Sequence, residues 1–139
     1  YFPDAGITTD VIVGFPGETE EEFEDTIRVC KRAGFAWLHV FPYSVRKGTV
    51  AAKMKQVDPE VMTERAARLR AVSDELKTEF LKKQIGKIKE VYVEEEFDGF
   101  GAGFASDYVR VYSDAAPGTF AKQKITSLFR DGVKGETIQ

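Results

Sequence analysis

The chain has 139 residues, of which 42% are hydrophobic and 31% are charged, and its net charge is -3. These values are typical of a globular protein with one ordinary domain or two small ones, and no apolar run approaches the roughly 20 residues needed to cross a bilayer. Because the net charge is negative, the protein has no overall positive potential, and any surface that binds nucleic acid would have to be a local basic patch. The only cysteine, Cys30, excludes an internal disulfide and a cysteine-built metal site within the chain, and we expect a reducing, cytoplasmic location.

The first segment has the pattern of a strand, a glycine turn and a helix. Residues 7–13 are rich in β-branched side chains, as in a buried parallel strand. The turn GFPG follows at residues 14–17, and Thr19 then lies three positions before Glu22, which is the spacing of a capping box. The helix that follows is predicted to bury one stripe, made of Phe23, Ile27, Cys30 and Ala33.

A second strand is predicted at residues 37–43, after Gly34 ends the helix in a left-handed conformation. Together these elements predict a βαβ unit with parallel strands. Two parallel strands alone leave an apolar face and two edges uncovered. We therefore expect this segment to be incomplete, with neighbouring strands preceding residue 1, and we expect self-association through its open edge.

A basic loop and a long helix come next. Residues 44–57 (SVRKGTVAAKMKQV) form the loop, and Asp58 and Pro59 suit the N-cap and the first helical position. Apolar residues at steps of three and four predict one amphipathic helix that runs to about Gln84 and stops near Gly86.

After Gly86 the hydrophobic period changes from a helical one to two residues. Three strand candidates, KIKEVYVEEEF, FASDYVRVYSD and KQKITSLFRD, are separated by turn residues, and the final VKGETIQ adds a fourth. Several short strands within about 54 residues predict a small closed barrel of the OB type, because closure removes exposed strand edges.

Four stretches of the chain resemble the C-terminal part of radical S-adenosylmethionine methylthiotransferases: TDVIVGFPGETEEEFEDT, HVFPYSVRKGTVAAKMKQV, GKIKEVYVEEE and GFASDYVRVY. The residues HVFPYSVRKGTVAAKM are similar in particular to the MtaB branch, which adds a methylthio group to threonylcarbamoyladenosine beside the tRNA anticodon. Sister branches modify isopentenyladenosine in tRNA, or an aspartate of a ribosomal protein (the RimO type).

The resemblance implies an α/β protein in three parts. Residues 1–58 would be the C-terminal fragment of a partial (β/α) radical SAM barrel, residues 59–85 a connecting amphipathic helix, and residues 86–139 a TRAM domain, which is a small all-β, OB-like barrel that carries RNA. The parent enzyme would use S-adenosylmethionine and two iron-sulfur clusters. The cluster-binding CxxxCxxC loop has no counterpart here, so we expect the chain alone to hold no cofactor, metal or catalytic residue and to be inactive.

The resemblance also assigns two sets of site residues in the first segment. The cofactor-binding candidates are Ile12, Val13, Gly14, Phe15 and Pro16. The alternative for them is a strained turn whose glycines supply positive φ and close packing. The substrate-binding candidates are Ser44, Arg46, Lys47 and Thr49, in which the guanidinium would hold a phosphate or carboxylate. The alternative for these is a solvated basic loop. The only histidine, His39, is predicted to be structural or exposed at an edge.

The last segment carries the RNA-binding candidates, because exposed aromatic rings stack on unpaired bases and cations follow the backbone. They are Phe104, Tyr108, Arg110, Lys122 and Lys124. Strand alternation predicts Tyr108, Arg110 and Tyr112 on one face. The alternative is that about half of the aromatic residues fill the core of a small barrel. The expected partner is the anticodon stem-loop of a tRNA, and an RNA-binding module without catalysis is the competing function.

Overall fold

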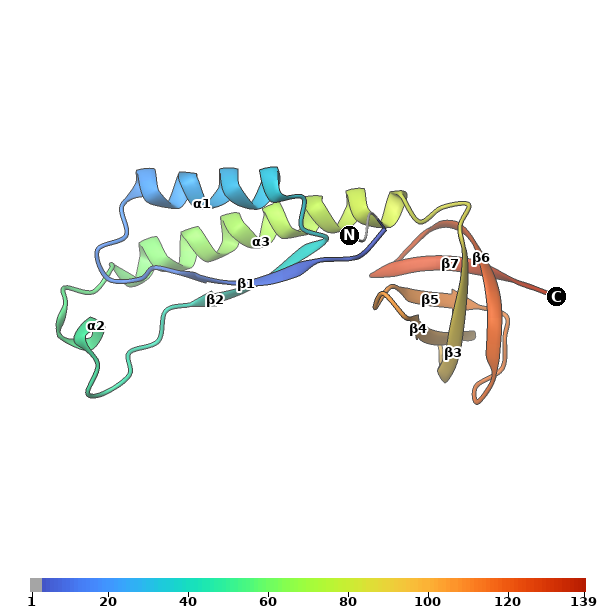
Figure 1. Ribbon diagram of the computed structural model, residues 1–139. Coiled ribbons are helices and arrows are strands. Elements are labelled where there is room, and N and C mark those ends of the chain that lie inside the picture. Colours follow the sequence, from blue (N-terminus) through green and yellow to red (C-terminus); the bar gives the residue numbers. More distant parts are fainter. Residues whose placement is uncertain (1–3) are drawn as a thin grey trace. The chain divides into compact units, whose positions relative to one another are not determined.

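The computed structural model describes residues 4–139 and divides into two compact units (Figure 1). One unit is Ile7–Lys77. The other combines residues 4–6 with Thr78–Gln139. The division falls inside the longest helix, α3 (Pro59–Lys82), whose last turn belongs to the second unit.

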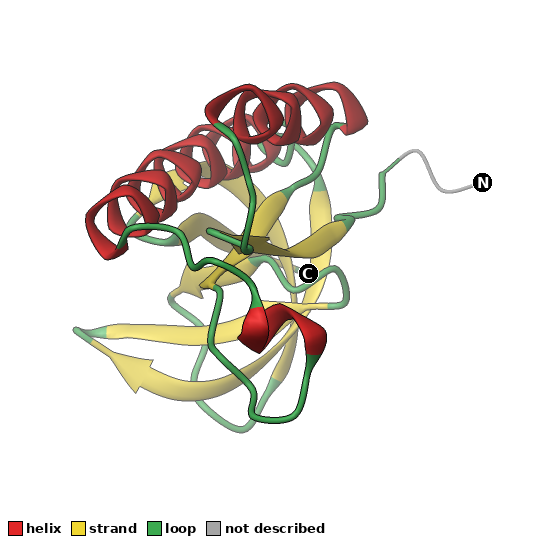
Figure 2. Ribbon diagram, turned by 90° about the vertical axis from the view of Figure 1, so that its left-hand side faces the viewer, coloured by secondary structure: helices red, strands yellow, loops and turns green. Residues whose placement is uncertain are grey.

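In the unit Ile7–Lys77, two parallel strands are covered on one face by two helices. Strand β1 (Thr8–Val13) pairs with β2 (Trp37–Pro42), in register from Thr8↔Trp37 to Val13↔Pro42. Helix α1 (Glu20–Ala33) connects the strands, and α3 lies beside α1 on the same side of the sheet (Figures 1 and 2). The buried core between these layers consists of Val13, Phe23, Cys30, Leu38, Ala66, Leu69 and Val72.

Helix α1 begins and ends at the predicted residues. The Glu22 backbone N–H donates to Thr19 Oγ1 at 3.2 Å, and the Thr19 N–H donates to the Glu22 carboxylate at 2.9 Å, so the predicted capping box is confirmed. At the other end Gly34 has φ 70°, and its N–H donates to Lys31 O. A residue with a Cβ disfavours this left-handed conformation, which explains the glycine.

The second unit contains five strands that close into a barrel. They are β3 (Ile88–Phe97), β4 (Phe100–Ala105), β5 (Arg110–Ser113), β6 (Phe120–Phe129) and β7 (Gly132–Ile138). The order around the barrel is β3-β4-β5-β7-β6, and β6 pairs again with β3. Neighbouring strands are antiparallel except β5 and β7, which are parallel. The core contains Leu81 from the end of α3 together with Val91, Ala105, Val109, Val111, Ile125 and Val133.

The structure differs from the expected elements in three places. The predicted strand 104–114 is divided between β4 and β5 by a turn, in which the Ala105 N–H donates to Val109 O at 3.0 Å. Tyr108 lies in this turn with φ 63°, a left-handed conformation that ends an extended strand. The expected loop 44–57 contains a short helix, α2 (Val50–Lys53), which Thr49 caps. Helix α3 ends at Lys82, slightly before the predicted end.

Candidate functional site

A groove lies where β1 and β2 end, and we call it the strand-end groove. Its volume is about 510 Å³. Alternation along each strand places Ile12 and Phe41 on the sheet face opposite the helices, where they are directly opposed in register. The lining residues are Asp10, Ile12, Phe15, Phe41, Pro42, Tyr43, Ser44, Arg46, Thr49 and Ala51.

The floor of the strand-end groove is apolar and open to solvent. Ile12 is 56% exposed and Phe41 is 51% exposed. At one side Phe15 and Tyr43 pack edge to face, with 5.3 Å between ring centroids. The buried Tyr43 hydroxyl has no hydrogen-bond partner within the described residues. An apolar floor with a few polar groups at its rim is the usual composition of a small-molecule site.

The glycine turn beside this groove is fixed by contacts with α3. Gly14 has φ 74°, and a Cβ built on it would lie 2.6 Å from Met62 Cγ. Its N–H donates to Glu18 Oε1 at 3.0 Å, and Arg65 of α3 donates to the same oxygen at 2.9 Å. The turn is therefore both sterically tight and tied to a buried ion pair.

The five cofactor candidates are divided by this arrangement. Ile12 and Phe15 line the strand-end groove. Val13 is fully buried in the core on the opposite face of the sheet, and Gly14 and Pro16 are buried in the turn. Binding by the latter three would have to use their backbone atoms.

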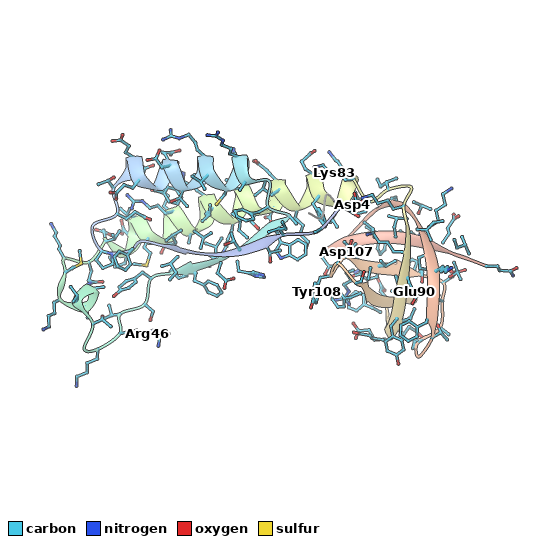
Figure 3. The ribbon with its side chains drawn as sticks, in the orientation of Figure 1. Asp4, Arg46, Lys83, Glu90, Asp107 and Tyr108 are labelled. Carbon is cyan, nitrogen blue, oxygen red and sulfur yellow. The ribbon has the colours of Figure 1, made fainter. Side chains whose placement is uncertain are left out.

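The substrate candidates lie in the loop after β2. Ser44, Arg46 and Thr49 line the groove, whereas Lys47 is exposed and is not among the lining residues. The Thr49 hydroxyl donates to Arg46 O at 2.7 Å and accepts from the Ala52 N–H at 3.2 Å, so it is already engaged in shaping the loop. Within residues 4–139, no carboxylate lies within 4.0 Å of the Arg46 guanidinium, which extends from this loop (Figure 3). Arg46 is thus the cation available to an anionic ligand at the groove.

A second candidate site lies on the outer surface of the barrel. The strand register places four side chains in one cross-strand line: Arg110 on β5 is opposite Phe104 on β4, Phe104 is opposite Tyr92 on β3, and Tyr92 is opposite Phe120 on β6. We call these four residues the aromatic row. The Tyr92 and Phe120 ring centroids are 4.9 Å apart, and the Arg110 guanidinium carbon lies 5.7 Å from the Phe104 ring centroid.

The rings of the aromatic row line a groove of about 610 Å³. They remain accessible: Tyr92 is 43% exposed, Phe104 42% and Phe120 73%. Arg110 is held beside them by Glu95, to which it donates at 2.8 Å. An exposed line of aromatic rings is able to stack on flat ligands such as nucleobases.

The structure places the five RNA-binding candidates in different surroundings. Phe104 and Arg110 belong to the aromatic row, and Lys122 and Lys124 are exposed on β6, where alternation places them on the same outer face as Phe120. Tyr108 is exposed in the turn between β4 and β5, and Figure 3 shows it beside Asp107. The predicted common face of Tyr108, Arg110 and Tyr112 is wrong for Tyr108, which precedes β5. Arg110 and Tyr112 do share a face, with the Arg110 guanidinium carbon 5.3 Å from the Tyr112 ring centroid, but Tyr112 is buried with its hydroxyl bonded to Asp131.

Sequence reasoning missed Tyr92 and Phe120 as site residues. Both were visible as aromatic residues in or next to predicted strands. Their alignment with Phe104 depends on the pairing of β3 with both β4 and β6, and a register is not visible in a strand taken alone.

The described residues contain no group of three or more His, Cys, Asp or Glu side chains able to hold a metal ion. Cys30 is buried in the core beneath α1, and burial raises the pKa of its thiol, which disfavours the thiolate that metal binding requires. The donor set of an iron-sulfur cluster is therefore not available in this chain. No helix among residues 4–139 is long and apolar enough to cross a membrane.

A βαβ unit with a groove at its strand ends, together with a five-stranded β-barrel, defines a mixed α/β protein with two candidate ligand surfaces. No family model matches the chain. It is 45% identical, over 78% of its length, to the threonylcarbamoyladenosine tRNA methylthiotransferase MtaB of Bacillus subtilis, and 43% identical, over 94%, to a probable threonylcarbamoyladenosine tRNA methylthiotransferase of Methanocaldococcus jannaschii. It is also 50% identical, over 67%, to a tRNA-2-methylthio-N(6)-dimethylallyladenosine synthase of Acidothermus cellulolyticus.

The chain belongs to the tRNA methylthiotransferase family and corresponds to a C-terminal portion of its members, as the sequence motifs predicted. It spans 26%, 30% and 19% of the length of these three relatives.

Proposed function

We propose that the chain is part of an enzyme that adds a methylthio group to threonylcarbamoyladenosine next to the anticodon of tRNA. The observation that carries this proposal is 43% identity over 94% of the chain to a relative named for that reaction. The relative from B. subtilis, at 45% identity, has a name for the same reaction. The activity belongs to the longer protein, and the chain alone is inactive.

The barrel is, in this proposal, a TRAM domain of the OB type that contacts the tRNA anticodon stem-loop. Numbered within the barrel, the strand order is 1-2-3-5-4, with strands 3 and 5 parallel and strand 4 returning to strand 1. This order supports an OB-type topology, in which oligonucleotides bind on the outer surface. The proposed division is a radical SAM barrel portion (1–58), a connecting helix (59–85) and the TRAM domain (86–139).

The strand-end groove is proposed to border S-adenosylmethionine. Its exposed apolar floor, Ile12 and Phe41, fits the flat adenine, and Arg46 fits an anionic group of the cofactor or of the substrate. When bound, S-adenosylmethionine would supply the methyl group and, after one-electron reduction by a cluster held elsewhere in the longer protein, the radical that activates the target carbon. The iron-sulfur clusters do not fit this chain, because its one thiol is buried. Further strands would cover the exposed sheet face, and self-association through β1 or β2 is what we expect of the chain alone.

The competing function is an RNA-binding module without catalysis. The aromatic row supports this function as strongly as it supports the enzyme. The two differ in whether the strand-end groove takes part in chemistry. No described feature favours a RimO-type enzyme that modifies a ribosomal protein.

A chimera tests the proposal. The matching portion of the B. subtilis relative is replaced by this chain, and methylthio addition is measured by mass spectrometry of tRNA from cells that lack the native enzyme. We expect methylthiolated threonylcarbamoyladenosine, and its loss when Arg46 is replaced by Met. Modified isopentenyladenosine or a modified ribosomal protein would assign a different branch. A folded chimera that binds tRNA but modifies nothing, with either substrate, would favour the module without catalysis.

A further inference from the structure

We infer that the groove over the aromatic row binds an unpaired stretch of RNA, whose bases stack on Tyr92, Phe104 and Phe120. This inference rests on the proposed function, since it assumes that the barrel serves an enzyme acting on tRNA. It adds the binding surface, the conformation of the RNA and the force that holds it.

The geometry of the aromatic row suits consecutive bases. Paired strands lie about 4.8 Å apart, so directly opposed rings form a ladder with similar spacing. The distance between the Tyr92 and Phe120 ring centroids, 4.9 Å, agrees with this spacing. The row extends from β6 across β3 to β4, and Arg110 of β5 continues it with a planar guanidinium beside Phe104. Both rings and guanidinium groups are surfaces on which bases stack.

The three rings are not required to fill the barrel. Their neighbours along the strands, Val91 and Ala105, are buried in the core, and strand alternation therefore directs Tyr92 and Phe104 outward. Phe120 is 73% exposed and packs only against Tyr92 among the ring pairs of the described chain. A contiguous exposed aromatic surface of this kind marks a binding site, because solvating it gives no stability to the fold.

Charge at the groove indicates an anionic ligand held by few ion contacts. Lys122 and Lys124 follow Phe120 on the outer face of β6, and within residues 4–139 neither ammonium has a carboxylate within 4.0 Å. Glu90 of β3 is opposite Lys122 in register and lines the groove (Figure 3). Arg110 is compensated by Glu95. Glu136 of β7 is likewise opposite Lys124 in register. Two lysines without a carboxylate in ion-pair contact are complementary to a phosphate backbone but too few to hold a duplex by phosphate contacts alone.

The closed barrel argues against a peptide as the ligand. Extended peptides commonly bind by adding a strand to an exposed sheet edge. In this barrel β3 pairs with β4 and β6 on its two sides, so the strand at the centre of the groove has no free edge. A ligand in the groove must therefore bind through side chains, and unpaired bases offer the flat faces that three rings require.

The test uses the 139-residue chain and a fluorescently labelled RNA with the sequence of an anticodon loop, either unpaired or annealed to its complement. Fluorescence anisotropy should show binding of the unpaired RNA and at least tenfold weaker binding of the duplex. Tyr92→Ala and Phe120→Ala should each weaken binding about 5- to 150-fold, the effect of losing one stacked base. Tyr92→Trp should retain binding, and Leu128→Ala, a truncation on β6 outside the groove, should leave it unchanged.

Salt dependence gives a second readout. Two phosphate contacts to a single strand predict a slope of about -1.4 for the logarithm of affinity against the logarithm of salt concentration. Circular dichroism of each variant verifies that the barrel is folded. Equal affinity for duplex and unpaired RNA, a slope several times steeper, or unchanged binding by the folded Tyr92→Ala and Phe120→Ala variants would overturn the inference.

The proposed function has a separate readout. If the chain binds a whole tRNA while both alanine variants bind it equally well, the stacking surface is wrong and the tRNA enzyme stands. Preferential binding of a ribosomal-protein peptide in the groove overturns the inference directly. If the chimera modifies no tRNA, the proposed function fails whatever the result of the stacking measurements.

Discussion

Arg65 of α3 donates to the carboxylate of Glu18 at 2.9 Å, with both side chains nearly buried at 7% and 12% exposure. The same arginine nitrogen donates to the Glu18 carbonyl at 3.0 Å. Since that carboxylate also accepts from the Gly14 N–H, one arginine on a helix fixes both ends of the turn beside the strand-end groove. The turn is therefore positioned by a residue 47 positions later in the chain.

Replacing Arg65 by Met should destabilise the unit Ile7–Lys77 by about 3–5 kcal/mol, because the Glu18 carboxylate is left buried without its counter-ion. Urea unfolding followed by circular dichroism measures the change. Arg28→Met is the control, since Arg28 pairs with Asp25 on the exposed side of α1 and should cost less than about 1 kcal/mol. Equal losses for the two variants would contradict a structural role for the buried pair.

Ser73 is predicted to hold β2 against α3. The Leu38 N–H donates to Ser73 Oγ at 2.9 Å, and the hydroxyl donates to Leu38 O at 3.1 Å, both in a buried position. Ser73→Ala should cost about 1–3 kcal/mol, because two backbone groups lose their partner. Amide hydrogen exchange at Leu38 should accelerate. Ser44→Ala, at an exposed serine in the same unit, should change stability by less than about 0.5 kcal/mol, and faster exchange at Leu38 in that variant would contradict the assignment.

Tyr112 is predicted to ionise at a higher pH than a free tyrosine side chain. Burial raises the pKa of its hydroxyl above the ordinary value of 10, and the hydrogen bond to Asp131 raises it further. A raised pKa in the folded state means that the neutral hydroxyl stabilises the barrel below about pH 10, and that this stability is lost as the pH rises through the folded pKa.

Absorbance at 295 nm measures this ionisation directly. A phase of the titration should lie above pH 10, and Tyr112→Phe should remove it. If the phase survives the substitution, another tyrosine is responsible.

Gly103 is predicted to be irreplaceable in β4. A Cβ at this position would lie 1.9 Å from the backbone oxygen of Tyr92, which cannot move without breaking the β3–β4 pairing. Gly103→Ala should therefore lower the free energy of unfolding by about 3 kcal/mol or more. Gly118→Ala tests conformational strain alone, because its Cβ would meet open space while φ is 85°, and it should cost about 1 kcal/mol. A thermal melt that ranks the two variants in the opposite order would contradict the steric explanation.

Elements defined by local signals were predictable from the sequence. The Thr19–Glu22 capping box, the left-handed Gly34 and the Asp58-Pro59 helix start each depend on a few adjacent residues, and the structure has all three. The family was also predictable, because motifs such as GFPGET can be recognised in the sequence without knowledge of the contacts that they make in the fold.

Features set by distant contacts were not predictable. The turn at Tyr108 interrupts a stretch whose alternation alone favours one continuous strand, and it is anchored by Asp107, whose carboxylate accepts from Lys89 of β3 at 2.5 Å. The aromatic row likewise depends on the register of three strand pairs. The burial of Val13, and with it the division of the cofactor candidates, follows from which sheet face α3 covers. None of these three features is determined by residues that are adjacent in the sequence.

The parallel pairing of β5 with β7 has a consequence for biosynthesis. Strand β7 closes the barrel by pairing with β5 on one side and β6 on the other. The sheet formed by the four earlier strands therefore retains two open edges until Gly132 and the residues after it have left the ribosome. A nascent chain stalled before that point presents a template for intermolecular pairing, so premature termination within this region should yield aggregated rather than merely shortened protein.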